Sequence, residues 1–226
     1  MFNYWLNALV AAAASVETPI GGQTGVWIKS GTTVIGSGMK MIGATVISGQ
    51  TQTLYLRGEA QTNTIVNGGR QYVYSGGNAK SCEYFGILRV YSGGTVVSPI
   101  FSSGANVAVS AGGVLTGGTH KPGASFNVYG VASLIAVDGT MFVSSGGLLE
   151  SATVAGGGEV DVRVSGTVSG AIVESAGRLI ISSGALGYSP VISSGGSLNV
   201  HAGASAVAVV SSAGAVVGGP GDITYA

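Results

Sequence analysis

Leu179-Ile180-Ile181 and Leu198-Asn199-Val200 carry the same pair of apolar residues nineteen positions apart, and each pair precedes a turn rich in Ser, Ala and Gly. Val107-Ala108-Val109 carries the same pair earlier in the chain. A strict period of this length indicates one supersecondary unit that winds repeatedly around an axis. Because side chains i and i+2 lie on one face of a strand, the two apolar columns are expected to line one wall of a core.

The repeat runs through most of the chain. One column contains Leu88, Val107, Phe126, Met141, Val160, Leu179, Leu198 and Val217, and its partner contains Val90, Val109, Val128, Val143, Val162, Ile181 and Val200. Another wall is expected from Ile135, Val154, Val173 and Ile192, and near the N-terminus from Ile28, Ile47, Val66 and Phe85. The step from Phe126 to Met141 is four residues short, and we assign the deletion to residues 129–134. The matching phrases 98–104 and 189–195 support this register.

The composition suits short strands joined by tight turns. The chain has 226 residues, of which 41 are Gly and only 8% are charged, while the 46% apolar fraction argues against disorder. The sequence has no run of 18 apolar residues, so no transmembrane segment is predicted. Nine basic and nine acidic residues balance, which makes nucleic acid an unexpected partner. With a single cysteine, Cys82, no internal disulfide can form.

These patterns predict one elongated all-β domain, a parallel β-solenoid of about ten coils over residues 21–217, followed by a C-terminal tail over 218–226. Each coil is expected to hold two or three short strands. The outward positions between the two inward columns show no repeated chemistry, which argues against an ice-binding face. These positions are Arg89, Ala108, Asn127, Phe142, Asp161, Ile180 and Asn199.

Residues 1–20 differ from the repeats and are rich in alanine, which predicts a short helix. The segment has no Lys or Arg, so it does not match a secretory signal. We interpret it as an N-terminal helical cap over the first open coil, with Trp5 and Trp27 packing beneath it. A membrane-surface or self-association element and an atypical targeting segment are the alternatives.

The phrase apolar-x-apolar-x-Ser-Gly-Gly recurs, and Asn63-Thr64-Ile65-Val66-Asn67-Gly68-Gly69 leads into Arg70-Gln71-Tyr72-Val73-Tyr74-Ser75-Gly76-Gly77. In these residues the chain resembles the passenger repeats of self-associating autotransporter adhesins, including the adhesin involved in diffuse adherence. The resemblance is strongest over residues 45–115 and extends to about residue 217. The sequence shows neither the long leader nor the C-terminal translocator barrel of that pattern, which suggests either a passenger fragment or a free-standing relative.

The resemblance implies a single-stranded right-handed parallel β-helix on a bacterial cell surface or outside the cell. It also implies adhesion, self-association and biofilm formation through contacts between rods or with host or bacterial surfaces. A glycosyltransferase partner is implied too, because Ser or Thr in the turns would carry O-linked heptose, as in a glycoprotein. The matching positions are Ser75, Ser92, Ser145 and Ser194.

One pair of carboxylates offers an enzymatic alternative. Glu159 and Asp161, with Arg163, project from one face of one expected strand, at separations that glycoside or polyuronide cleavage can use. No second coil reinforces the pair, so a solvated charge cluster is the preferred interpretation. A carbohydrate-active or carbohydrate-binding β-helix, of the lyase, hydrolase or tail-spike type, remains the alternative to a non-enzymatic adhesin or fibre subunit.

Metal and cofactor sites are not predicted. The stretch 156–161 has Glu where a calcium-binding toxin repeat has glycine, and the stretch 218–222 has its Asp one place early. His120 and His201 fall in different columns and Cys82 is remote from both, so a zinc site is not expected. We assign His120 to an irregular or rim position in the column of Phe101 and Ile135.

Overall fold

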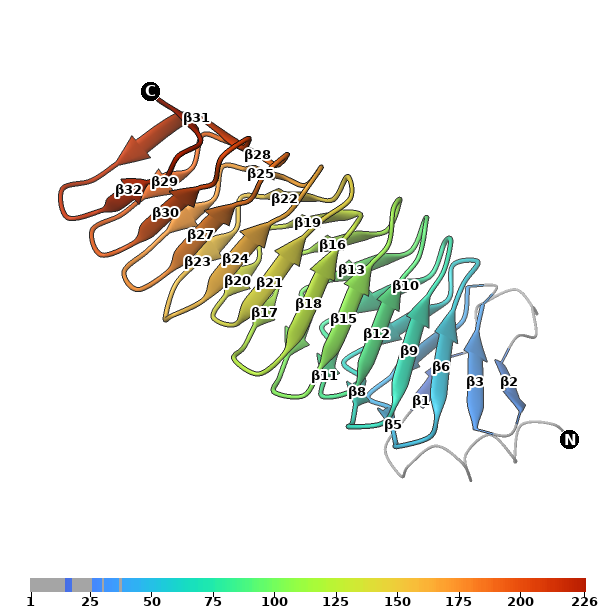
Figure 1. Ribbon diagram of the computed structural model, residues 1–226. Helices are drawn as coiled ribbons and strands as arrows, with labels where there is room; N and C mark the ends of the chain where they lie inside the picture. The colour runs from blue at the N-terminus through green and yellow to red at the C-terminus, as the bar shows by residue number, and fades with distance from the viewer. Residues whose placement is uncertain (1–14, 18–25, 30, 37) are drawn as a thin grey trace, which may run out of the picture.

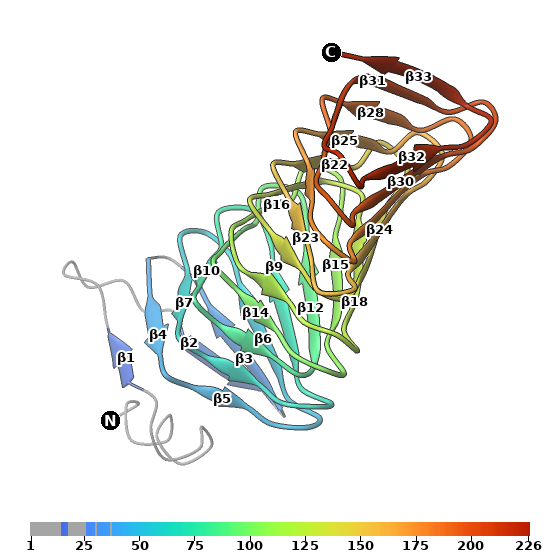
Figure 2. The ribbon, with the colours of Figure 1, turned by 90° about the vertical axis from the view of Figure 1, so that its left-hand side faces the viewer.

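The computed structural model describes residues 15–17, 26–29, 31–36 and 38–226. In this part of the chain the secondary structure is all strand and turn, without a helix. The strands form a parallel β-solenoid of about ten coils with a period near nineteen residues, which confirms the predicted fold class. Figures 1 and 2 show the coils stacked into an elongated rod, with the first described coils and the C-terminal strands at opposite ends.

A typical coil gives one strand to each of three sheets, joined by three corners. Sheet 1 contains β2 (Val26–Lys29), β3 (Thr32–Ile35), β6 (Thr51–Leu54), β9 (Arg70–Val73), β12 (Ile87–Val90), β15 (Asn106–Val109), β18 (Ser125–Val128), β21 (Thr140–Val143), β24 (Glu159–Val162), β27 (Arg178–Ile181), β30 (Ser197–Val200) and β32 (Val216–Gly218). Sheet 2 contains β1 (Ser15–Glu17), β4 (Lys40–Ile42), β7 (Glu59–Gln61), β10 (Asn78–Lys80), β13 (Thr95–Val97), β16 (Val114–Thr116), β19 (Val131–Ser133), β22 (Leu148–Glu150), β25 (Thr167–Ser169), β28 (Leu186–Tyr188) and β33 (Asp222–Tyr225).

Sheet 3 contains β5 (Thr45–Val46), β8 (Thr64–Ile65), β11 (Glu83–Tyr84), β14 (Ile100–Phe101), β17 (Thr119–His120), β20 (Ala136–Val137), β23 (Thr153–Val154), β26 (Ile172–Val173) and β29 (Val191–Ile192). The seven-residue β31 (Ser205–Ser211) runs through both sheet 2 and sheet 3. We call the turn from sheet 1 to sheet 2 the first corner, from sheet 2 to sheet 3 the second, and from sheet 3 to sheet 1 the third.

The two apolar columns of sheet 1 stack as the sequence predicts. Val107 pairs in register with Leu88 on one side and with Phe126 on the other, and all three side chains are fully buried. Met141 follows Phe126 despite the shorter coil. At the C-terminal end Val217 is only partly buried against this core. The core of the rod is therefore a stack of Val, Leu, Ile and Phe side chains.

The predicted wall on the third sheet is wrong in two places. Val137, and not Ile135, pairs with Val154, although Ile135 is also buried beside it. The N-terminal wall is shifted by one residue: its buried members are Val46, Ile65 and Tyr84, while Ile47, Val66 and Phe85 are partly or well exposed. Ile28 lies in β2, and its side chain is outside the described residues.

The short coil loses its four residues at two corners. Two are missing at the first corner, where Tyr129-Gly130 replaces a four-residue turn, and two at the third corner, at Asp138-Gly139. The predicted single deletion within 129–134 is therefore only half right. A third short corner, Phe85-Gly86, makes the coil from Val73 to Val90 seventeen residues long.

Both ends differ from a simple stack of identical coils. Ser15–Glu17, where the sequence predicts helix, forms β1, which pairs antiparallel with β4. The rest of the predicted cap, including Trp5, lies outside the described residues. At the other end β33 pairs in parallel with β31, so residues of the predicted 218–226 tail continue the ladder.

The last glycine of each Ser-Gly-Gly turn is required by the coil before it. A Cβ at Gly147 would lie 2.2 Å from the carbonyl oxygen of Val128, and one at Gly94 would lie 2.3 Å from that of Val73. Neither glycine has a positive φ, so close backbone contact and not turn geometry excludes a side chain. The short corners obey the same rule, because a Cβ at Gly130 would lie 2.3 Å from the Ser110 carbonyl oxygen.

Gly147→Ala is expected to lower the free energy of unfolding by ~2 kcal/mol or more, because two stacked coils must separate locally to admit the methyl group. Gly218→Ala is the matched control, since its Cβ would meet nothing within 4 Å and its φ is not in the left-handed region. Denaturant unfolding followed by circular dichroism measures both. Equal stability of the two variants would contradict the proposed backbone constraint.

Candidate functional site

The four serines that the resemblance marks as glycosylation positions all lie exposed at corners. Ser75, Ser92 and Ser145 occupy the first corner, and Ser194 occupies the third. Ser75 lies beneath Gly93 of the following coil, where a Cβ would come within 2.7 Å of its Oγ. The structure therefore places three candidates along one edge of the rod and the fourth along another.

The charged residues of the enzymatic alternative lie on the outer face of sheet 1 and are engaged in ion pairs. Arg163 Nε lies 2.9 Å from Asp161 Oδ2, and its guanidinium carbon lies 3.8 Å from the centre of the Phe142 ring. Ser182 Oγ donates a hydrogen bond to Asp161 Oδ1. Arg178 Nη1 lies 2.9 Å from Glu159 Oε2 on the neighbouring strand. The arrangement is a surface charge network across β24 and β27.

The residues considered for metal binding do not converge. Gly156–Gly158 form the third corner ahead of β24, and Glu159 and Asp161 face cationic partners. Within the described residues there is no group of three or more His, Cys, Asp or Glu side chains arranged to hold a metal ion. Cys82 is buried with its thiol near the carbonyl oxygens of Ala60 and Lys80, and burial raises the pKa of that thiol.

His120 is a core residue, so its predicted rim position is wrong. It ends β17, pairs in register with Phe101 and Val137, and is fully buried. Its Nε2 donates to the Ala124 carbonyl oxygen at 3.1 Å, while Nδ1 has no hydrogen-bond partner. The ring packs edge-on against Phe126 at 5.7 Å. The short Asp138-Gly139 corner covers it, since a Cβ at Gly139 would lie 2.8 Å from its Cε1.

A buried polar network interrupts the apolar core in the N-terminal coils. Gln71 donates to Gln52, Tyr84 donates its hydroxyl to Gln71, and Asn63 donates to Gln52 at 3.2 Å. Asn63 also accepts the backbone N–H of Ala44 at 2.9 Å. Burial raises the pKa of Tyr84 well above its ordinary value, so the hydroxyl stays protonated and can donate.

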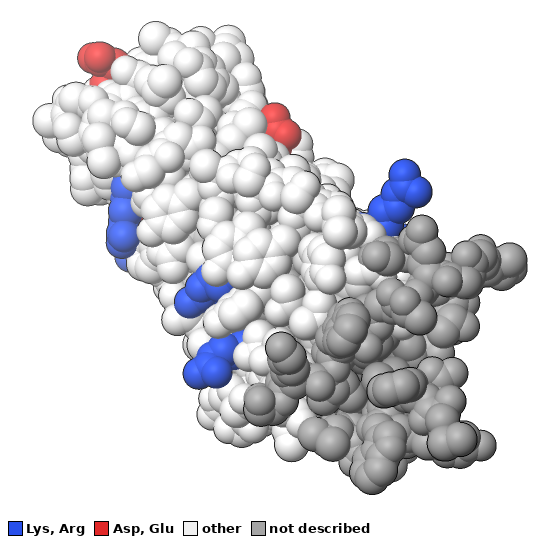
Figure 3. Space-filling view, turned by 90° about the vertical axis from the view of Figure 1, so that its right-hand side faces the viewer, with Lys and Arg blue, Asp and Glu red and all other residues white. Residues whose placement is uncertain are grey.

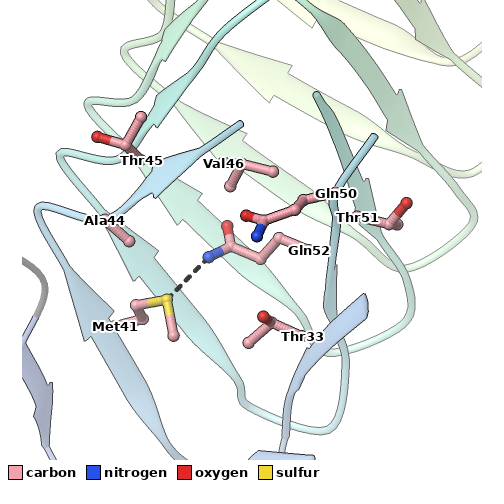
Figure 4. A pocket seen from close by; sticks show the side chains of 8 residues that line it. All are labelled: Thr33, Met41, Ala44, Thr45, Val46, Gln50, Thr51 and Gln52. Atoms are coloured by element: carbon pink, nitrogen blue, oxygen red, sulfur yellow. Dashed lines mark hydrogen bonds between the residues drawn. The ribbon is translucent and has the colours of Figure 1, made fainter. Parts of the chain in front are cut away.

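A small cavity adjoins this network, and Figure 4 shows Gln52 reaching the sulfur of Met41 across it. The cavity is lined by Thr33, Met41, Ala44, Thr45, Val46, Gln50, Thr51 and Gln52. Gln52 and Gln71 occupy the column that Leu88 and Val107 continue. The network could have been recognised in the sequence from two Gln residues standing at apolar column positions.

A second feature missed in the sequence is a group of tyrosines at the first corner and on sheet 1. Tyr74 and Tyr91 stack with ring centroids 4.5 Å apart and planes only 7° from parallel. Tyr72 packs edge-on against Tyr91 at 6.2 Å. Tyr55, Tyr74 and Tyr91 take the same corner position in three successive coils, a spacing that was available in the sequence.

Comparison with known proteins finds similarity to a solved structure. No protein-family model matches the chain, and no curated protein matches it. The crystal structure of a TibC-catalysed hyper-glycosylated fragment of TibA, residues 55–350, superposes with a TM-score of 0.76. The two sequences are 29% identical, and the match covers 85% of this chain and 80% of that one.

TibA is an autotransporter adhesin, so the chain has a fold like that of an autotransporter adhesin passenger. The fold therefore agrees with the resemblance to autotransporter adhesin passengers that the sequence repeats suggested. In that structure the TibA fragment is hyper-glycosylated, and TibC catalyses the modification. Within the described part of the chain, no helix has the length and hydrophobicity needed to cross a membrane.

The burial of His120 predicts a pH-dependent stability. Burial lowers its pKa below the ordinary value of 6.5, although the hydrogen bond to Ala124 and the nearby Asp138 partly oppose this. Below pH 6.5 the unfolded chain binds a proton that the folded chain does not yet bind, so stability falls as the pH falls and levels off below the folded-state pKa. His120→Leu is expected to flatten this dependence between about pH 7 and pH 5.

The matched control is His201→Leu, which removes an exposed histidine from the same rod. Denaturant unfolding at a series of pH values measures both variants against the original chain. A slope that is the same in the His120 variant as in the original chain would show that His120 does not carry the effect.

Proposed function

We propose that the chain is the passenger-type rod of a bacterial surface adhesin, located at the cell surface or outside the cell. It acts without catalysis, through contacts of its outer faces with other rods or with host and bacterial surfaces. The observation that carries the proposal is the superposition on the TibA fragment over 85% of the chain. Self-association, fibre assembly and biofilm formation are the outcomes we expect from such contacts.

The geometry suits this role. Continuous parallel ladders hold the outward side chains of successive coils about 4.8 Å apart along a rigid rod. Many weak contacts can then form at once between two rods, and their combined strength exceeds that of any single contact. Outward apolar side chains are available for this on sheet 2, where Tyr188 and Val207 pair in register and are both exposed.

We further propose that a glycosyltransferase modifies the exposed corner serines Ser75, Ser92, Ser145 and Ser194. Their hydroxyls lie outside the ladder hydrogen bonds, so an attached sugar leaves the core and the strand pairing intact. Three of the four share the first corner, which would place sugars along one edge of the rod. Support comes from the glycosylated state of the TibA fragment.

Display of the chain on a non-adherent bacterium is expected to speed settling of the cells and to increase attachment to surfaces. Cells that carry the display system alone are the control. Mixing labelled displaying cells with unlabelled non-displaying cells separates the two modes, since self-association gives aggregates of displaying cells only. Settling and attachment at the level of the control would contradict an adhesive function.

Treatment with an autotransporter glycosyltransferase and its nucleotide-activated heptose donor is expected to add sugar mass to the purified chain. Changing each of Ser75, Ser92, Ser145 and Ser194 to Ala should remove one sugar apiece, as read by intact-mass and peptide mass spectrometry. Ser102→Ala is the control, because Ser102 is buried and should stay unmodified. Sugars found only at other residues would refute the assignment of these four.

A further inference from the structure

The tyrosines at the first corner lie near arginines of the same and neighbouring coils, and together these residues form a cationic surface. Arg89 pairs in register with Tyr72 on the neighbouring strand, and Arg70 stands two residues before Tyr72 on the same face of β9. Arg57 projects from the first corner, where its backbone N–H donates to the Gly76 carbonyl oxygen. We define the tyrosine–arginine patch as Arg57, Arg70, Arg89, Tyr72, Tyr74 and Tyr91.

The arginines of this patch make no ion pair with any described residue. The described ion pairs involve Lys40, Lys80, Arg163 and Arg178. Arg89 Nη1 donates to the carbonyl oxygens of Leu88 and Asn106, at 2.9 and 2.8 Å. These bonds hold the guanidinium against the surface and leave its other N–H groups available. Figure 3 shows Lys and Arg atoms along one edge of the rod, without Asp or Glu atoms between them.

Arg57 is unusual because it stands where the following coils have glycine. Its φ is 67°, and the equivalent residues Gly76 and Gly93 have φ of 73°. A side chain in this left-handed region is unfavourable, and the residue before it, Leu56, is also left-handed at 47°. A positive charge is therefore placed at this corner, one coil before the corner of Tyr74 and Gly76, where glycine would be the less strained residue.

We propose that the tyrosine–arginine patch binds an anionic polysaccharide along the rod axis. Guanidinium groups bind carboxylate or sulfate groups through paired charge-assisted hydrogen bonds. The phenol hydroxyls supply hydrogen-bonding groups for sugar hydroxyls. Burial and the neighbouring tyrosines raise the pKa of Tyr74. Because these groups are distributed over three successive coils spaced about 4.8 Å apart, they match a chain of sugars better than a compact ligand.

The ring arrangement argues against single-stranded nucleic acid as the ligand. Bases bind such surfaces by stacking on free aromatic faces. Here Tyr74 and Tyr91 stack on each other and Tyr72 meets Tyr91 edge-on, so one face of each stacked ring is already covered and is closed to a base. Tyr74 keeps 39% of its surface exposed. This inference goes beyond the adhesin function and does not depend on it.

The test uses the purified chain and four probes: heparin, which is sulfated, polygalacturonate, which is carboxylated, neutral dextran, and a single-stranded DNA oligonucleotide. Heparin, polygalacturonate or both should bind, with affinity that falls as salt rises, and dextran should not. Binding of heparin alone assigns sulfate, and binding of polygalacturonate alone assigns carboxylate. DNA binding as tight as that of the polysaccharides would overturn the proposal, as would equal dextran binding or no binding at all.

Arg70→Gln with Arg89→Gln is expected to weaken polysaccharide binding about tenfold, since two charge-assisted contacts are lost. Arg163→Gln with Arg178→Gln removes the same charge from the same sheet farther along the rod, and should leave affinity within about twofold. Tyr74→Phe keeps the ring stack, loses the hydroxyl, and should weaken binding severalfold. Thermal unfolding checks that each variant folds. An equal loss in both arginine pairs would mean general charge attraction and would overturn the site.

Discussion

The structure depends on the hydrogen bonding of each coil to the coils before and after it. Parallel strands pair along each of the three sheets from β3, β4 and β5 onward, and the register shifts only in the last pair, β31 with β33, between Ala206 and Val209. Since a coil meets only its neighbours, stability comes from intrinsic coil terms and interface terms added along the rod. Side chains need to match only the residues directly above and below, which is why Leu88, Val107 and Phe126 can differ in size within one column.

The same stacking dictates the glycines at the corners. Each corner turns the chain while staying one strand spacing away from the corner of the preceding coil. At this distance a carbonyl oxygen of the preceding coil lies directly opposite a Cα of the next coil, and no space remains there for a Cβ. Gly147 over Val128 and Gly130 over Ser110 illustrate this in a long and a short corner. The abundance of glycine therefore follows from the vertical contact between coils as much as from the need for positive φ.

The solenoid could be predicted from the sequence because apolar residues that recur at a fixed spacing of about nineteen are typical of stacked, repeated coils. The sequence predicted the inward-facing columns of sheet 1 in particular. The coils are fifteen, seventeen or nineteen residues long, so their lengths differ by even numbers. Because side chains alternate between the two faces of a strand, the same positions face inward in every coil. On sheet 3, whose strands have only two residues, the sequence pattern placed Val154, Val173 and Ile192 correctly but was wrong at Ile135 and in the N-terminal coils. Val46 and Ile47 are both apolar, as are Ile65 and Val66, so the pattern alone did not show which member of each pair faces inward.

Sites were harder to predict than the fold for a related reason. Inward positions are constrained by their neighbours, and departures from the pattern are visible there: Gln52 and Gln71 stand in an apolar column, and His120 stands between Phe101 and Val137. Outward positions carry no such constraint, so the repeat gives no signal for them, and the pairing of Arg163 with Asp161 could be suggested only from their local spacing. Contacts between outward groups on neighbouring coils become evident only when the coil lengths are known.

The division between a constrained interior and a free exterior also indicates where function can reside. The interior of the described coils is filled by stacked side chains and by a hydrogen-bonded polar network, with a small cavity beside Gln52. Recognition must therefore use the outer faces, where each coil can change its chemistry without disturbing the ladder. On those faces Tyr74 and Tyr91 form a rigid group because strand pairing sets the distance between their rings. A regular scaffold thus orders surface side chains that a flexible loop would have to order at an entropic cost.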